Sequence, residues 1–150
     1  MLTQGQQDGG DILFAFNGLN SRIQTLFESK QLYRINFQHR QKSKFNWLCN
    51  VISPRQIQSL TLSDNPGTTG QIYQFLSKFS FDKFSDTLQS LSLYNVTSDQ
   101  CKLILSKLSS FKQLTHLSIY IEEEYSNSLI SLIHETILSD IIPTLKYFTC

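Results

Sequence analysis

The sequence predicts an α/β fold in which strand–helix units are stacked into a solenoid. The first observation is that the spacing apolar-x-x-apolar-x-apolar recurs, with copies starting at residues 32, 57, 88, 114 and 145. These starts are 25, 31, 26 and 31 residues apart, an interval typical of stacked repeats. The second is that the first four copies are each followed by an apolar pattern with helical spacing. The third is that turn signals separate the strand patterns from the helix patterns.

The N-terminal part is predicted to be helical after a short lead. Residues 1–10 are rich in Gln and Gly and are predicted to be disordered. They lack a basic segment followed by an apolar run, so a signal peptide is not expected. In residues 11–30 the apolar side chains recur at spacings of three and four, which predicts a helical segment. Asp11 suits its N-terminal end, and Gly18 is expected to divide it, with a second short helix over residues 22–28.

Five strands follow from the five copies of the apolar motif. In the central copy, Leu88, Leu91 and Leu93 are expected to be buried, because alternate residues of a strand point to one face. The residues that alternate with them are expected to point to the opposite face.

Four helices are predicted behind the first four strands. Each has apolar residues at i, i+3, i+4 and i+7, which fall on one helix face. The four sets are Phe45, Leu48, Cys49 and Ile52; Ile72, Phe75, Leu76 and Phe79; Cys101, Ile104, Leu105 and Leu108; and Leu129, Leu132, Ile133 and, one residue late, Ile137. Ser98 or Asp99 is expected to cap the third helix, and residues 64–67, Asp-Asn-Pro-Gly, predict a turn after the second strand.

The strand motif followed by a turn and a helix resembles the leucine-rich repeat. The long intervals and the helix start at residues 98–101, Ser-Asp-Gln-Cys, look most like the repeats of F-box/leucine-rich-repeat proteins. The N-terminal segment, with Asp-Ile-Leu at residues 11–13 and Gly-Leu-Asn-Ser-Arg-Ile at residues 18–23, is similar to the second half of an F-box. The opening Leu-Pro-x-Glu-Ile-Leu half is absent, and Gln24 stands where the tryptophan of the second half would fall.

The resemblance implies an F-box-like helical remnant at 11–30 and a leucine-rich-repeat domain at 31–150. It implies parallel strands on a concave face, helices on a convex face and the N-terminal helical segment as a cap. The implied function is a protein–protein interaction scaffold, the substrate-recognition part of a ubiquitin-ligase adaptor that holds a ubiquitination substrate. A complete F-box would also dock onto the adaptor subunit of an SCF-type ligase, which half a box implies less strongly. The alternative is a free-standing or degenerate leucine-rich-repeat module with no ligase link.

The candidate binding surface is the predicted concave face. Its outward positions are Arg34, Asn36, Gln38, Ser59, Thr61, Ser63, Ser90, Ser92, Tyr94, His116, Ser118, Tyr120, Tyr147 and Thr149. We predict partner binding for all of them except Gln38, Ser63 and Thr149. Tyr94 and Tyr120 have the same register in adjacent copies, so they should lie about 5 Å apart. They are either a binding hot spot or ordinary strand tyrosines favoured by β-propensity.

The residues do not predict an enzyme, a metal site or a cofactor. His39, His116 and His134 are scattered, and none has a predicted nucleophile and acid beside it. Cys49 and Cys101 occupy apolar helix positions and are expected to be buried thiols rather than metal ligands. No Gly-rich phosphate-binding loop precedes a helix.

The charge pattern also limits the expected partners. The net charge of +1 and the lack of a long apolar run predict neither nucleic-acid binding nor a membrane span. A local basic cluster comprises Arg34, His39, Arg40, Lys42 and Lys44. It is either a solvated loop, which the balanced total charge favours, or a contact for an acidic partner or a phosphate backbone. The three cysteines without a C-x-x-C spacing and the missing export signal predict a cytoplasmic or nuclear location.

Overall fold

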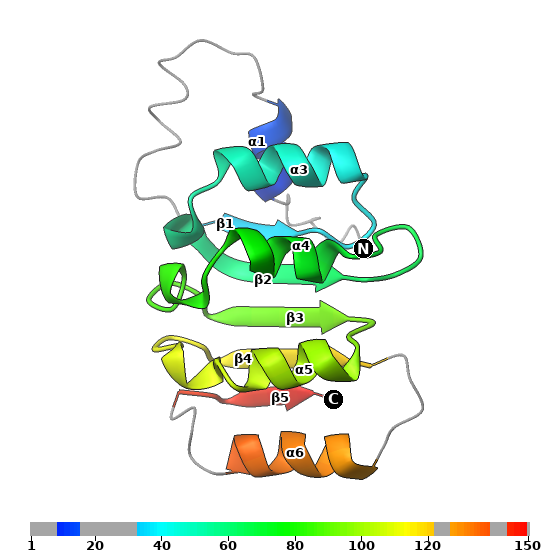
Figure 1. The fold of residues 1–150 in the computed structure, drawn as a ribbon. Coiled ribbons are helices and arrows are strands. Elements are labelled where there is room, and N and C mark those ends of the chain that lie inside the picture. The colour runs from blue at the N-terminus through cyan, green and yellow to red at the C-terminus, as the bar shows by residue number, and fades with distance from the viewer. Residues whose placement is uncertain (1–8, 16–32, 122–126, 139–143, 150) are drawn as a thin grey trace, which may run out of the picture.

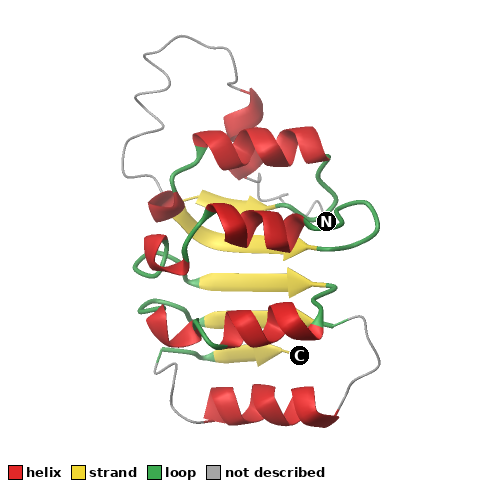
Figure 2. Ribbon diagram, in the orientation of Figure 1, coloured by secondary structure: helices red, strands yellow, loops and turns green. Residues whose placement is uncertain are grey.

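The computed structural model describes residues 9–15, 33–121, 127–138 and 144–149. Its helices are α1 (Gly9–Ala15), α3 (Lys42–Val51), α4 (Gln71–Lys78), α5 (Ser98–Leu105) and α6 (Asn127–Leu138). Its strands are β1 (Tyr33–Asn36), β2 (Ile57–Ser63), β3 (Ser90–Tyr94), β4 (His116–Tyr120) and β5 (Tyr147–Thr149). Short 3-10 helices, η1 (Pro54–Gln56), η2 (Phe81–Lys83) and η3 (Leu108–Ser110), precede β2, β3 and β4. Helices and strands alternate along the chain (Figure 2).

All five strands form one parallel sheet, and their order in the sheet is their order in the chain. Parallel neighbours need a crossover connection, which α3, α4 and α5 supply between β1 and β4. Figure 1 shows α4 and α5 lying across the same face of the sheet. The α/β class predicted from the sequence is confirmed.

The apolar motif marks the strands with a small offset. Leu91 pairs in register with Leu60 on β2 and Leu117 on β4, and all three side chains are buried. Leu88 is also buried, but it lies in the loop before β3, where its backbone N–H donates to the Phe84 carbonyl at 3.0 Å. In the copies that start at residues 88, 114 and 145 the first apolar residue therefore precedes the strand, whereas Ile57 is the first residue of β2.

The helices end earlier than the apolar spacing predicts. Ile52 and Phe79 are the C-caps of α3 and α4, with extended backbones, and Leu108 belongs to η3. All three are nevertheless buried, because the chain turns toward the sheet directly after each helix. The side chains of Leu129 and Ile137 lie outside the described residues.

The cap of α5 differs from the prediction. Thr97 is the N-cap, rather than Ser98 or Asp99. Its Oγ1 accepts from the Gln100 N–H at 3.4 Å, and Gln100 Oε1 accepts from the Thr97 N–H at 3.0 Å. This capping box satisfies two backbone donors at once, and the helix begins one residue earlier than a Ser98 cap and two residues earlier than an Asp99 cap would place it.

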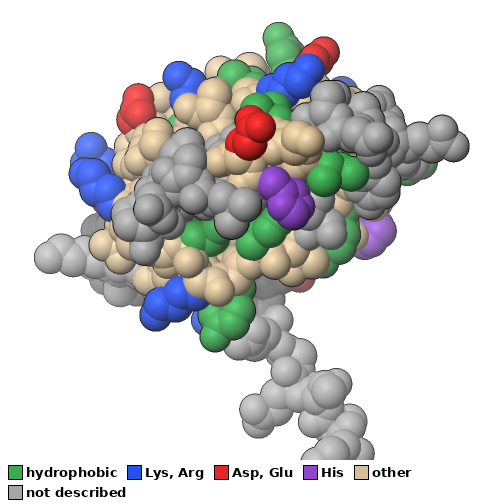
Figure 3. All heavy atoms as spheres, turned by 90° about the horizontal axis from the view of Figure 1, so that it is seen from below, with side chains coloured by type: hydrophobic (Ala, Val, Ile, Leu, Met, Phe, Trp, Pro, Cys, Tyr) green, Lys and Arg blue, Asp and Glu red, His purple; other side chains and the backbone are tan. Residues whose placement is uncertain are grey.

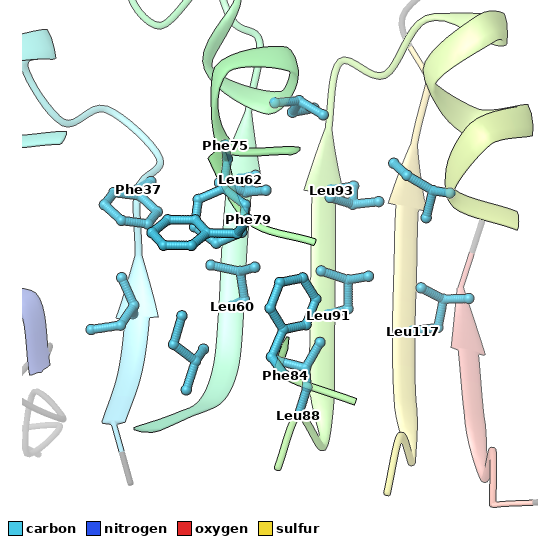
Figure 4. Close-up of a cluster of buried hydrophobic side chains, with 14 of the residues drawn as sticks. Phe37, Leu60, Leu62, Phe75, Phe79, Phe84, Leu88, Leu91, Leu93 and Leu117 are labelled. Carbon is cyan, nitrogen blue, oxygen red and sulfur yellow. The ribbon is translucent and has the colours of Figure 1, made fainter. Parts of the chain in front are cut away.

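The core between the sheet and the helices is rich in phenylalanine (Figure 4). Phe37 contacts Phe45 edge-to-face with ring centroids 4.8 Å apart, and Phe75 contacts Phe79 at 4.8 Å. Phe84 lies in the connection before β3, where it is buried and stacks on Phe111 at 5.8 Å. Aromatic pairs in such geometries contribute about 0.5–1.5 kcal/mol beyond the burial of their area.

A buried polar side chain links the ends of the first two strands. Gln71, at the start of α4, is almost fully buried. Its Oε1 accepts from the Ser63 N–H at 3.0 Å, and its Nε2 donates to the Phe37 carbonyl at 3.1 Å. Asp64 extends the connection, because its Oδ1 accepts from the Ile72 N–H and its Oδ2 accepts from the Gln100 side chain. Three successive strand–helix crossovers are thereby tied together on the side where the strands end.

The N-terminal helix packs against the edge of the sheet. Gly9 and Gly10 begin α1 and are buried, so the predicted disordered lead is too long by these two residues. A Cβ on Gly9 would lie 3.1 Å from the Arg34 carbonyl oxygen, so a larger residue there would have to push the β1 backbone away by a few tenths of an ångström. Asp11 pairs with Arg40 at 2.7 Å. Residues 1–8 and the predicted helix over residues 22–28 lie outside the described residues.

Two further observations bear on the predicted partners. Among the described helices, none has the length and apolar character needed to cross a bilayer. Seen from the end where α6 and β5 lie, the surface shows scattered charged side chains of both signs together with hydrophobic ones (Figure 3).

Candidate functional site

The side chains that alternate with the buried ones form the opposite face of the sheet, here called the polar face. Strand pairing arranges it in three rows that cross the strands. The first row is Arg34, Ser59, Ser90, His116 and Tyr147; the second is Asn36, Thr61, Ser92, Ser118 and Thr149; and the third is Ser63, Tyr94 and Tyr120. The structure places every residue predicted to bind a partner in one of these rows, and their role in binding stays a prediction.

Exposure on the polar face varies from strand to strand. Arg34, Asn36 and His116 are exposed, and the serines of β2, β3 and β4 are half-buried except for Ser63. Ser63 was predicted to face outward but is fully buried. Its N–H donates to Gln71 and its Oγ accepts from the Asn65 N–H at 3.2 Å, so its polar atoms are used within the turn after β2.

Tyr94 and Tyr120 form a stacked pair in the third row. Their ring centroids are 4.5 Å apart and the planes differ by 9°. Parallel pairing holds the two residues side by side, at the separation that the sequence register predicts. Burial raises the pKa of the Tyr94 phenol, and the neighbouring Tyr120 raises it further. Tyr120 remains 41% exposed, so the pair presents a preformed aromatic surface.

A second stacked pair, His116 and Tyr147, was not anticipated. The ring centroids are 4.5 Å apart at 20°, and His116 Nδ1 lies 2.8 Å from Thr115 Oγ1. Tyr147 is 62% exposed. His116 and Tyr147 each lie two residues after the start of their motif copies. This shared position in the motif is the feature of the sequence that could have predicted their contact. The two pairs together make the β3–β5 end of the polar face aromatic.

The histidines show no catalytic arrangement within the described part of the chain. No carboxylate there forms an ion pair with His116. His39 lies in the turn after β1 and His134 is exposed on α6, so the three imidazoles belong to separate elements. A hydrolytic triad needs a nucleophile, a base and an orienting acid in contact.

Cys49 and Cys101 are buried thiols in the core. Burial raises the pKa of Cys49 to about 12, so the thiol is protonated at neutral pH. Among the described residues, no three His, Cys, Asp or Glu side chains form a cluster that could hold a metal ion.

Both thiols are expected to resist labelling in the folded protein. In a Cys150→Ser variant, a disulfide reagent at pH 8 should label Cys49 and Cys101 only after denaturant is added, because the thiolate is the reactive form. The readout is the number of thiols titrated with and without denaturant. Rapid labelling of either thiol in the native state would contradict its burial.

A polar cavity of about 480 Å³, here called the β1 pocket, borders the polar face at the end of β1. Asn36 and Lys44 line it, together with Arg40 and Asp11. The Arg40 side chain is only 10% exposed, so its prediction as part of a solvated loop is wrong. Its Nε donates to the Asn36 carbonyl at 2.6 Å and its Nη1 to Asp11 at 2.7 Å.

The electrostatics of the β1 pocket follow from these contacts. The hydrogen bond from Arg40 holds the pKa of the Asp11 carboxyl below its usual value, with a smaller contribution from the charge of Lys44. Asp11 is therefore ionised at neutral pH and fixes the guanidinium of Arg40. His39, which also lines the pocket, has a left-handed backbone with φ 62°, a conformation in which histidine, asparagine and aspartate are enriched among the residues other than glycine.

A comparison of the chain with protein-family models, with curated proteins and with solved structures gave no match.

Proposed function

We propose that this protein is a protein-interaction scaffold, built as a leucine-rich-repeat solenoid whose polar face binds a partner protein. The observation that carries the proposal is the Tyr94–Tyr120 stack, because it is preformed, partly exposed and central to the sheet. Tyrosine is enriched at binding hot spots, where it offers a large contact area with few rotatable bonds. The rows of hydroxyl groups beside it supply hydrogen-bond donors and acceptors.

The solenoid is supported by the arrangement of the strands. They are parallel, they follow chain order, and the equivalent residues of successive motif copies pair with one another. This is the arrangement expected when stacked units each bury the apolar face of a neighbour. The polar face would then be the concave surface on which such scaffolds bind partners.

The leading candidate within this class is the substrate-recognition part of an F-box/leucine-rich-repeat ubiquitin-ligase adaptor. It rests on the sequence resemblance described above, and the partner would then be a ubiquitination substrate in the cytoplasm or nucleus. An experiment that tests the ligase link is a pull-down with the small adaptor subunit of an SCF-type ligase. Binding would support this candidate, and its absence would favour the next one.

The second candidate is a free-standing leucine-rich-repeat binding module. It is favoured by the role of α1, which lies in the segment that resembles an F-box. Leu13 of this helix is buried in the domain core, Gly9 approaches β1 and Asp11 pairs with Arg40. Groups engaged in this way inside the domain are not available for docking onto an adaptor.

Removing the tyrosine pair is expected to abolish partner capture. In affinity capture from the native cell, the double variant Tyr94→Ala/Tyr120→Ala should lose its partners, with an affinity loss of about 30-fold or more for a hot spot worth about 2 kcal/mol. The matched control is Tyr73→Ala on α4, where the tyrosine is 73% exposed on the other side of the molecule. Tyr73→Ala should retain the wild-type melting curve, and the double variant should remain folded with a melting temperature lowered by the loss of the ring stack. Identical partners for the double variant and the wild type would refute binding by the polar face.

A further inference from the structure

The polar face differs in chemistry from one end to the other. Among its described residues, Arg34 on β1 is the charged side chain, and no row contains a carboxylate. The aromatic residues Tyr94, Tyr120 and Tyr147 all lie on β3, β4 and β5. The face is therefore cationic at the β1 end and apolar at the other, with hydroxyl groups between.

The β1 pocket adds to the positive charge at its end. Among the described residues, Arg40 and Lys44 line it together with one carboxylate, Asp11. Because Asp11 is hydrogen-bonded to Arg40, its charge is offset and the guanidinium is held in one position. Arg34 lies two residues before Asn36 on β1, so the described charged residues at this end are the cations Arg34, Arg40 and Lys44 and the carboxylate Asp11. A preorganised guanidinium beside an ammonium group is suited to a carboxylate, through charge-assisted hydrogen bonds.

The distance between the β1 pocket and the Tyr94–Tyr120 pair determines how far apart the two binding groups of a ligand must be. Asn36, which lines the pocket, lies two strands from Tyr94 and three strands from Tyr120. With strands about 4.8 Å apart and a shift of two residues along the strand, the pocket and the tyrosine pair are separated by about 12–16 Å. An extended peptide advances about 3.3 Å per residue and turns alternate side chains to the same side. Side chains about four residues apart therefore span the gap while both face the sheet.

Building on the proposed function, we propose that the polar face binds an extended, linear segment of a partner protein that crosses the strands. An Asp or Glu side chain of this segment enters the β1 pocket, where it meets Arg40 and Lys44. An apolar or aromatic side chain about four residues away packs on the Tyr94–Tyr120 pair. Between these two anchors, Thr61 and Ser92 hydrogen-bond to the backbone of the segment, which makes the intervening sequence less important than the anchors.

The test is a selection of displayed random linear peptides on the whole chain. Enriched peptides should share an acidic residue about four positions from an apolar or aromatic one. For a synthetic peptide of this kind, Lys44→Gln should weaken binding about fivefold, and Tyr94→Ala/Tyr120→Ala should weaken it more. The matched control for charge is Lys42→Gln, which lies on the same helix but does not line the β1 pocket. Replacing the acidic residue of the peptide by its amide should weaken wild-type binding and remove the difference between wild type and Lys44→Gln.

The results separate this inference from the function on which it rests. Peptides that depend on the tyrosines but show no preference for an acidic residue would overturn the inference and leave the binding scaffold intact. If no linear peptide is enriched while captured partners still depend on Tyr94 and Tyr120, the inference also fails, because the face then recognises a folded surface. Loss of both peptide selection and tyrosine-dependent capture would overturn the inference and the proposed function together.

Discussion

Leu91→Asp is expected to unfold the chain. Leu91 is 3% exposed and lies at the centre of the sheet, in register with Leu60 and Leu117. A carboxylate placed there would be buried without a partner, at a cost of several kcal/mol. Because domains of this size are stable by about 5–15 kcal/mol in total, most or all of the folded population should be lost. Circular dichroism and urea denaturation measure the effect directly.

The neighbouring residue supplies a matched control. Ser92 is next to Leu91 in the same strand, but its side chain points to the polar face. Ser92→Asp should lower the free energy of unfolding by about 1 kcal/mol or less, because the half-buried side chain reaches water and β-propensities differ by about that much. A Leu91→Asp protein with the wild-type melting curve would show that the assignment of buried and polar faces, and with it the proposed solenoid, is wrong.

Gln71→Leu is expected to lower the free energy of unfolding by about 1–3 kcal/mol. The substitution keeps a side chain of similar size but removes the amide, which accepts from the Ser63 N–H and donates to the Phe37 carbonyl. The buried Ser63 N–H would be left without its acceptor, at a cost of about 1–3 kcal/mol, whereas the Phe37 carbonyl would still accept from the Arg40 N–H at 3.1 Å. Urea denaturation gives the total loss, and hydrogen exchange gives its location, since the Ser63 amide should lose protection first.

Gln74→Leu is the control for this substitution. Gln74 lies on the same helix, is exposed and donates to the Asn46 side chain at 2.8 Å. Its replacement should change stability by less than about 1 kcal/mol, because water can replace the lost partner. If the two variants are equally stable, Gln71 does not hold the strand ends together.

The parts of the fold that could be predicted are those with a regular apolar period. Each strand motif is followed by a helical apolar pattern, and this regular succession predicted the α/β class. Tyr94 and Tyr120 occupy the same position of their motif copies, which predicted their contact. The same register relates His116 and Tyr147, so that pair was also within reach of the sequence. These features depend only on a residue's position within the motif, so they can be read from any copy of it.

Features that depend on single contacts between distant segments could not be predicted. Gln71 looks like an ordinary polar residue at a helix start, and nothing nearby indicates that it reaches Phe37, which is 34 residues earlier in the chain. The same amide accepts from the N–H of the buried Ser63. Arg40 and Asp11 are 29 residues apart, so a basic loop in the sequence becomes one wall of a cavity only in the folded protein.

The chain-order sheet has a consequence for chain entropy during folding. Paired residues on neighbouring strands are between 24 and 31 positions apart, from Tyr33–Ile57 to Ser59–Ser90. Because the entropy of loop closure grows only with the logarithm of loop length, closing the longest of these loops costs about 0.2 kcal/mol more than closing the shortest. The entropy of loop closure therefore favours no strand pair over another as the first to form. The phenylalanines packed on β1, β2 and β3 are then expected to decide where the sheet begins to assemble.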